Sequence, residues 1–160
     1  MNFTEAMVDG FAEEQSILEN SCIDKFDGEY AFLSNFYNSP IQPFNDWIVY
    51  PTVEHAFQAA KTNDISIRKK IASQPTPGKA KSIGRHVTLV PNWRDNRIYV
   101  MYQCLRAKFE QPDLREKLLA TGDAKLIEGN WWKDTYWGVC NGIGENNLGK
   151  LLMKVRGELR

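Results

Sequence analysis

Helical patterns follow one another along this sequence from residue 51 to residue 122, and no other feature constrains the fold as strongly. The first begins after Thr52, a good N-cap, and its apolar positions recur at i, i+3, i+4 and i+7: Val53, Ala56, Phe57 and Ala60. Further helices are predicted over residues 65–73, 76–85, 93–110 and 113–122, and another ends the chain. Aromatic and β-branched residues broken by Gly and Pro between residues 26 and 49 indicate short strands. Because these strands cluster early and do not alternate with helices, the sequence predicts a single helix-dominated α+β domain with short antiparallel strands near the N-terminal third.

The composition suits one compact domain, since the 160-residue chain is 42% hydrophobic and 25% charged. No apolar run approaches the roughly 18 residues that a membrane-spanning helix needs. The first residues are acidic, whereas a signal peptide begins with a basic segment. We therefore expect a cytoplasmic protein. Residues 1–22 carry a weak apolar stripe that can form a loosely attached helix.

Cysteine and histidine are too few and too scattered to indicate a metal site. Cys22, Cys104 and Cys140 lack a C-x-x-C spacing, so we expect them to be small buried side chains rather than disulfide partners or zinc ligands. His55 and His86 lie in different segments and do not form an H-E-x-x-H pair. No metal and no cofactor are therefore predicted.

Charge is balanced overall but unevenly distributed. The formal net charge is zero, which argues against a protein that binds nucleic acids or membranes through bulk electrostatics. Between Lys61 and Arg97, however, nine basic residues face two acidic ones. This excess favours an anionic ligand for the middle of the chain, although a solvated basic helix over residues 66–72 explains part of it equally well.

An acid, an amide and an amine share one side of the first predicted helix. Glu54, Gln58 and Lys61 stack within roughly 60° of one another beside the apolar stripe. A surface role remains open, because an acid in the first turn suits the helix dipole and Lys61 can pair with Asp64. Partial burial would instead raise the pKa of the acid and lower that of the amine, which suits acid–base or Schiff-base chemistry. His55 points elsewhere and is expected to be exposed or to act in capping.

A glycine-rich stretch over residues 137–149 precedes the C-terminal helix and follows several aromatic residues. Its backbone N–H groups can bind an anion, and exposed tryptophans can stack on a heterocyclic base. The glycines can equally serve only to allow a tight loop, and we expect at least two tryptophans to lie in the core.

Taken together, these segments resemble the NADAR family, also called YbiA-like N-glycosidases. The similar blocks are residues 32–36 (FLSNF), 51–61 (PTVEHAFQAAK), 84–85 (GR), 134–138 (DTYWG) and 144–156, with Trp93 and residues 108–109 between them. The resemblance implies a catalytic domain over residues 26–160, preceded by an extension of residues 1–25. It also implies hydrolysis of the N-glycosidic bond between a base and a ribose that carries a phosphate or diphosphate. The implied substrates are phosphoribosylamino-pyrimidine intermediates of riboflavin synthesis or guanine bases that carry ADP-ribose.

The resemblance assigns roles to individual residues. Its functional positions match Glu54, Lys61, Trp93 and Asp134. Its substrate pocket corresponds to Asn35, Phe36, Arg85, Trp137, Gly138 and Asn147. We expect acid–base work from Glu54 and Asp134, with Lys61 as either covalent catalyst or phosphate clamp. Val139 and Cys140 depart from the Asp and Gly of some members, which affects base selectivity more than catalysis.

Two other functions remain possible at this point. A binding module would recognise ADP-ribose or a nucleotide without hydrolysing it. A nucleic-acid-binding domain would use the basic segment with tryptophans as stacking platforms. The expected partners are therefore a small phosphoribosyl or ADP-ribosyl substrate, or ADP-ribosylated guanine in nucleic acid, and no membrane. The oligomeric state is left open.

Overall fold

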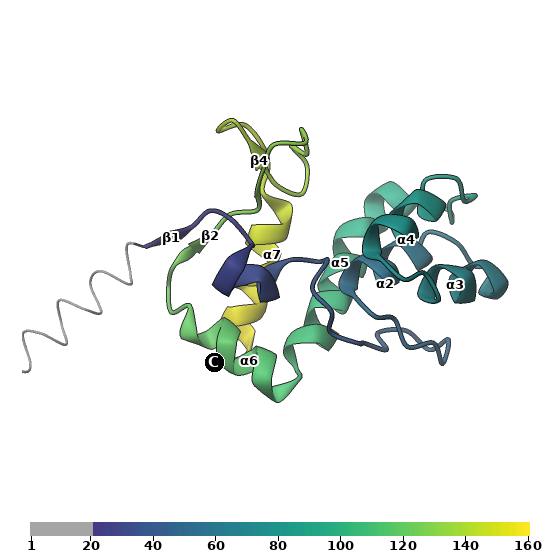
Figure 1. Cartoon of the computed structure of the whole chain (residues 1–160), viewed down its shortest axis with the longest axis horizontal. Helices are drawn as coiled ribbons and strands as arrows, with labels where there is room; N and C mark the ends of the chain where they lie inside the picture. The colour runs from purple at the N-terminus through teal and green to yellow at the C-terminus, as the bar shows by residue number, and fades with distance from the viewer. Residues whose placement is uncertain (1–20) are drawn as a thin grey trace, which may run out of the picture. The chain divides into compact units, whose positions relative to one another are not determined.

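The computed structural model describes residues 21–160, so the helix expected within residues 1–22 falls almost entirely outside the described residues. The described chain forms two compact units (Figure 1). One contains Asp27–Arg115, and the other contains residues 21–26 with Glu116–Arg160.

The unit formed by Asp27–Arg115 is largely helical. A 3₁₀ helix, η1 (Gly28–Leu33), is followed by α2 (Val53–Ala59), α3 (Ile65–Ala72), α4 (Pro77–Gly84) and α5 (Trp93–Phe109). The N-caps of three helices are local side-chain bonds: Thr52 accepts from His55 N, Asp64 from Ser66 and Ile67 N, and Thr76 from Lys79 N. The helices predicted for this region are thus confirmed. Three of them begin directly after the capping residues Thr52, Asp64 and Thr76.

Helix α2 is the centre of this unit. All of its residues are buried, and α3, α4 and α5 pack against it (Figure 1). The apolar stripe of α2 therefore forms only part of its packed surface. Its polar residues must also find partners inside the protein, since a buried polar group without a hydrogen bond costs free energy.

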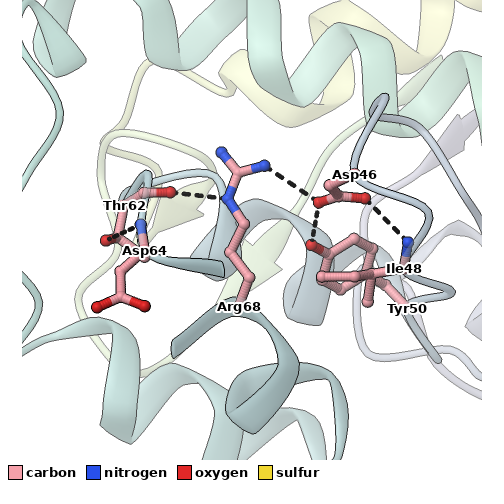
Figure 2. A network of polar contacts seen from close by, with 6 residues as sticks. All are labelled: Asp46, Ile48, Tyr50, Thr62, Asp64 and Arg68. Carbon is pink, nitrogen blue, oxygen red and sulfur yellow. Dashed lines mark hydrogen bonds and ion pairs between the residues drawn. The ribbon is translucent and has the colours of Figure 1, made fainter. Parts of the chain in front are cut away.

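The segment between η1 and α2 is a braced loop with little regular structure. It has one antiparallel bridge, between Ile41 and Tyr50. Asp46 accepts hydrogen bonds from the Tyr50 hydroxyl (2.5 Å) and from Ile48 N (3.1 Å). Arg68 of α3 donates from Nη1 to Asp46 (3.1 Å) and from Nε to the carbonyl oxygen of Thr62 (2.7 Å), as Figure 2 shows. This network joins the loop to α3 and to the chain directly after Lys61.

The second unit contains the C-terminal helix and two short parallel pairs of strands. Strand β1 (Cys22–Ile23) pairs with β2 (Lys125–Leu126), and β3 (Gly129–Asn130) pairs with β4 (Val139–Cys140). Helix α7 (Asn147–Glu158) packs against β2, while α6 (Pro112–Ala120) begins in the first unit and ends in the second. The core of this second unit includes Leu118, Leu126, Leu148, Leu152 and Val155.

The helix-dominated α+β class is confirmed, and the described chain has the short strands expected of it. Their pairing differs from the prediction, because both named pairs of strands are parallel and lie outside residues 26–49. The region expected to form antiparallel strands is mostly the 3₁₀ helix and the braced loop, with the Ile41–Tyr50 bridge as its antiparallel element. No helix among residues 21–160 is long and apolar enough to cross a membrane.

Several side-chain expectations need correction. His55 takes part in capping, one of its two expected roles, because its backbone N donates to the N-cap Thr52. It is buried rather than exposed, and its ring bonds to Thr52 through Nδ1 (2.8 Å) and to the carbonyl oxygen of Gln74 through Nε2 (2.9 Å). Cys22 is exposed, whereas Cys104 and Cys140 are buried as expected. Of the five tryptophans, Trp93 is buried and Trp137 partly buried; the exposed ones are Trp47, Trp131 and Trp132. His55 is buried because it lies on the central helix α2. Cys22 and the exposed tryptophans instead lie at a strand end and in loops, where position decides exposure more than residue type does.

Candidate functional site

Glu54 and Gln58 form a buried polar pair inside the first unit. Glu54 is 7% exposed and Gln58 is 3% exposed. Gln58 Nε2 donates a hydrogen bond to Glu54 Oε1 over 2.7 Å. The i,i+4 spacing on α2 explains this contact, because such residues are neighbours on a helix surface. The carboxyl group is therefore held in one orientation within a largely water-free environment.

The pKa values of Glu54 and Lys61 are shifted in opposite directions. Burial raises the pKa of the Glu54 carboxyl above its ordinary 4.5, while the Gln58 hydrogen bond and the charges of Lys81 and Lys61 oppose this rise. Burial lowers the pKa of the Lys61 amine below its ordinary 10.5, and the charges of Lys81 and Arg85 act in the same direction. Both shifts move the groups towards neutral pH, where acid–base catalysis and amine nucleophiles are effective.

Lys81 is a member of this cluster that sequence reasoning missed. It lies on α4, and its charge acts on both Glu54 and Lys61. Lys81 and Arg85 are four residues apart and so face the same way on a helix. This spacing is the sequence feature that could have pointed to Lys81. The packing of α4 against α2 was needed to show that Lys81 acts on Glu54 and Lys61.

An aromatic pair adjoins the cluster. The rings of Phe57 and Trp93 have centroids 5.2 Å apart, and Lys61 Nζ lies 5.9 Å from the Phe57 centroid. Trp93 is the first residue of α5 and is buried. This arrangement excludes water from one side of Lys61, which is consistent with the direction of its pKa shift.

The segment after η1 contacts the first turn of α2. The carbonyl oxygen of Asn35 accepts a hydrogen bond from Glu54 N (3.1 Å), and Lys108 Nζ donates to the carbonyl oxygen of Ser34 (2.8 Å). Asn35 Oδ1 is buried and has no hydrogen-bond partner in the described protein. Phe36, the next residue, is 49% exposed. Asn35 thus offers an unused acceptor beside the catalytic candidates, and Phe36 offers an exposed ring.

The other expected site residues belong to the second unit. Asp134 Oδ1 accepts hydrogen bonds from Tyr136 N (3.1 Å) and Trp137 N (2.9 Å). Asn130 Nδ2 donates to the carbonyl oxygen of Asp134 over 2.8 Å. The carboxylate of Asp134 therefore organises the turn that carries Trp137, whose ring packs edge-on against Tyr136 with centroids 4.9 Å apart.

Gly138 and Asn147 shape the same loop. A Cβ atom at Gly138 would lie 2.7 Å from Asn130 Nδ2 and 2.9 Å from Glu128 Cγ, so a side chain has no room there. Asn147 Nδ2 donates to the carbonyl oxygen of Tyr136 (2.9 Å) and to Glu145 Oε2 (2.8 Å). Both residues have clear structural roles in the loop. Residues 21–160 bring together no group of three or more His, Cys, Asp or Glu side chains suited to a metal ion.

Comparison with known structures identifies the fold first. The solution NMR structure of the E. coli protein YbiA matches with a TM-score of 0.77 and 40% sequence identity, covering 88% of this chain and 85% of that one. The chain is therefore an α+β protein with the YbiA fold.

Sequence comparison then gives the family. The NADAR domain matches residues 14–160. The chain is 40% identical over 151 residues to N-glycosidase YbiA of Escherichia coli (strain K12), covering 91% of this chain and 92% of that protein. An N-glycosidase of Nostoc punctiforme is 38% identical over 82% of this chain and 86% of its own length. A riboflavin biosynthesis protein of Vibrio vulnificus is 36% identical over 84% of this chain, which spans only 37% of that longer protein. This chain belongs to the NADAR family.

Proposed function

We propose that this protein is an N-glycosidase that hydrolyses the C1–N bond between a phosphorylated ribose and a nitrogenous base. The main observation in support is the buried Glu54 carboxyl, held by Gln58 and close enough to Lys61 and Lys81 to sense their charges. N-glycosidase is also the printed name of relatives that cover nearly the whole chain. We assign catalysis to residues 26–160.

The chemistry of this bond suits a carboxyl group in a dry site. Breaking the C1–N bond builds positive charge on the ribose ring, and a nearby carboxylate stabilises that charge most strongly where water is excluded. Glu54 is our candidate for this role, and Asp134 is the candidate for the second carboxylate of the reaction. Trp93 limits the access of water to the Lys61 side of the site.

The phosphate of the substrate is assigned to the cations next to Glu54. Lys61, Lys81 and Arg85 repel one another, so an anion that binds among them gains favourable interactions with all three. We expect Lys81→Gln to raise KM about 10-fold with a smaller change in kcat, the loss expected for one charge-assisted contact. Lys79→Gln, on an exposed position of the same helix, is the matched control. Equal KM values for the two variants would remove Lys81 from the phosphate site.

Lys61 is assigned either covalent catalysis or phosphate binding. A ring-opened ribose exposes an aldehyde at C1, and an amine with a lowered pKa can attack it to form a Schiff base with loss of water. Borohydride added during turnover should then attach the sugar to Lys61, which peptide mapping by mass spectrometry detects. Turnover without an adduct at Lys61 would leave only the phosphate-binding role.

The substrate class is the finer part of this proposal. The name of the Vibrio vulnificus relative supports a phosphoribosylamino-pyrimidine intermediate of riboflavin synthesis, and ADP-ribosylated guanine is the other candidate. Separate incubation with each compound, followed by mass spectrometry of the free base and the sugar phosphate, tests both. Release of base from either supports the function and selects the substrate. Tight binding of ADP-ribose with no base release from either compound would instead indicate a binding module.

A further inference from the structure

The side-chain amide of Gln58 is enclosed between Glu54 and Gly84. Its Nε2 donates to Glu54, whereas its Oε1 is buried and accepts no hydrogen bond in the described protein. Gly84 of α4 faces this oxygen, since a Cβ atom there would collide with Oε1 and would lie 2.8 Å from Gln58 Cδ and 2.9 Å from Gln58 Cβ. Gln58 fits only because residue 84 has no side chain.

This packing decides which way the amide points. With Oε1 against Gly84, the carbonyl dipole meets the weakly positive Cα–H group, which is a favourable though minor contact. Rotating the amide by half a turn would press the NH₂ group against the same Cα–H and would direct Oε1 at the Glu54 oxygen. Two acceptors would then face each other unless Glu54 carried a proton. The observed orientation places an N–H donor on the Glu54 carboxyl, and such a donor stabilises the carboxylate more than it stabilises the neutral acid.

We infer that Gln58, fixed by Gly84, is a positioning residue that keeps Glu54 in its carboxylate form, so that Glu54 acts as the base in the reaction and not as the proton donor. This inference rests on the proposed N-glycosidase function. From the sequence, acid–base catalysis is assigned to Glu54 and Asp134 together, and this inference assigns the role of base to Glu54.

The charged groups around Glu54 act in the same direction as Gln58. Lys81 of α4 and Lys61 and His55 of the α2 region all favour the carboxylate. Cys104 of α5 is the titratable group that senses Glu54 from that helix, and burial keeps its thiol neutral by raising its pKa. On α3, Arg68 is paired with Asp46. Burial alone favours the neutral acid, and Gln58 is the hydrogen-bond donor that opposes it.

The step assigned to Glu54 is the attack of water on the ribose. The oxygen of a water molecule forms a bond to C1 of the ribose while the C1–N bond breaks and its electron pair stays on the nitrogen. The water proton passes to the carboxylate of Glu54, through the oxygen that does not accept from Gln58. The departing nitrogen takes a proton from a different group or from solvent. A protonated Glu54 would be unable to accept the proton of the attacking water.

The test compares pH profiles of kcat/KM for the wild type and Gln58→Met, which keeps the length of the side chain and removes the donor. If Glu54 must be ionised, its titration gives the acidic limb. Loss of a hydrogen bond to the charged form should move that limb upward by about one pH unit or more, with activity on the alkaline side nearly unchanged. Gln74→Met is the control and should leave the profile in place, because the Gln74 side chain donates to the carbonyl oxygen of Lys70 on α3.

Two outcomes would overturn the inference. Movement of the alkaline limb alone would show that Glu54 works in its protonated form. A uniform loss of activity at every pH would make Gln58 a structural residue. Titration of the Glu54 carboxyl carbon by NMR, assigned with Glu54→Gln, supplies a readout that needs no turnover. It should show an ionised Glu54 at pH 7 in the wild type and a higher pKa in Gln58→Met. Absence of base release by the wild type would contradict the proposed function, while the NMR titration would still decide the ionisation state.

Discussion

Replacement of Glu54 by Gln is expected to slow base release by at least about 100-fold, the range that removal of a general base typically costs. The substitution keeps the size of the side chain and its ability to accept the hydrogen bond from Gln58, but it removes the negative charge. Release of free base under saturating substrate gives kcat for the two proteins. Glu116→Gln, on the exposed side of α6, is the control and should retain wild-type activity.

The same variant is expected to be more stable than the wild type near neutral pH. Because burial raises the pKa of Glu54, ionising this group costs the folded state free energy once the pH exceeds the ordinary value of 4.5. The free energy of unfolding of the wild type should therefore fall as the pH rises through the folded-state pKa, whereas the neutral amide of the Glu54→Gln variant does not ionise and avoids this loss. Urea denaturation at several pH values measures the difference, which should shrink below pH 4.5. A variant that is both inactive and less stable at neutral pH would point to misfolding rather than lost chemistry.

Removal of the Asp46 carboxylate is expected to have the largest effect on stability. Asp46→Ala leaves the Tyr50 hydroxyl, Ile48 N and the Arg68 guanidinium without their shared acceptor (Figure 2). The side chains of Asp46 and Arg68 are 5% and 15% exposed, so we expect a loss of about 3 kcal/mol in the free energy of unfolding. Asp123→Ala, which removes an exposed ion pair with Arg160, should cost less than about 1 kcal/mol.

This loss should depend on pH in a defined direction. Burial opposes ionisation of Asp46, but the hydrogen bonds from Tyr50 and Ile48 and the charge of Arg68 outweigh it and hold the pKa below the ordinary 3.8. A lowered pKa means that the carboxylate stabilises the fold above pH 3.8 and that this contribution is lost as the pH falls through the folded-state value. Equal stability of Asp46→Ala and Asp123→Ala at neutral pH would show that the network is not a significant brace.

Local signals made the helices predictable. Thr52, Asp64 and Thr76 each cap the helix that follows them, and each cap depends on residues no more than three positions away. The loop before α2 was not predictable in the same way. Its aromatic and β-branched residues resemble strands, but its conformation depends on the contact of Asp46 with Arg68, which lies 22 positions further along the chain.

The candidate site shows the same division. Helical spacing alone predicts the column of Glu54, Gln58 and Lys61. The structure places Glu54 and Gln58 on α2 at the buried centre of a unit, whereas Lys61 lies in the turn that follows the end of this helix at Ala59. Lys81 could not be assigned from sequence, because its proximity to Glu54 arises from the packing of α4 on α2. The burial of His55 was missed for the same reason, since one of the two hydrogen bonds of its ring goes to the carbonyl oxygen of Gln74, beyond the end of α3.

The central claim is that Glu54 promotes attack of water on C1 of a phosphorylated ribose, and the fate of the water oxygen tests it most directly. Turnover in water labelled with heavy oxygen, stopped before the C1 oxygen of free sugar phosphate exchanges with solvent, should give a sugar phosphate that carries the label and a free base that keeps its nitrogen and carries none, in equal amounts, with Glu54→Gln producing neither. Heavy oxygen in the base, or base release that continues unchanged in Glu54→Gln, would contradict the account.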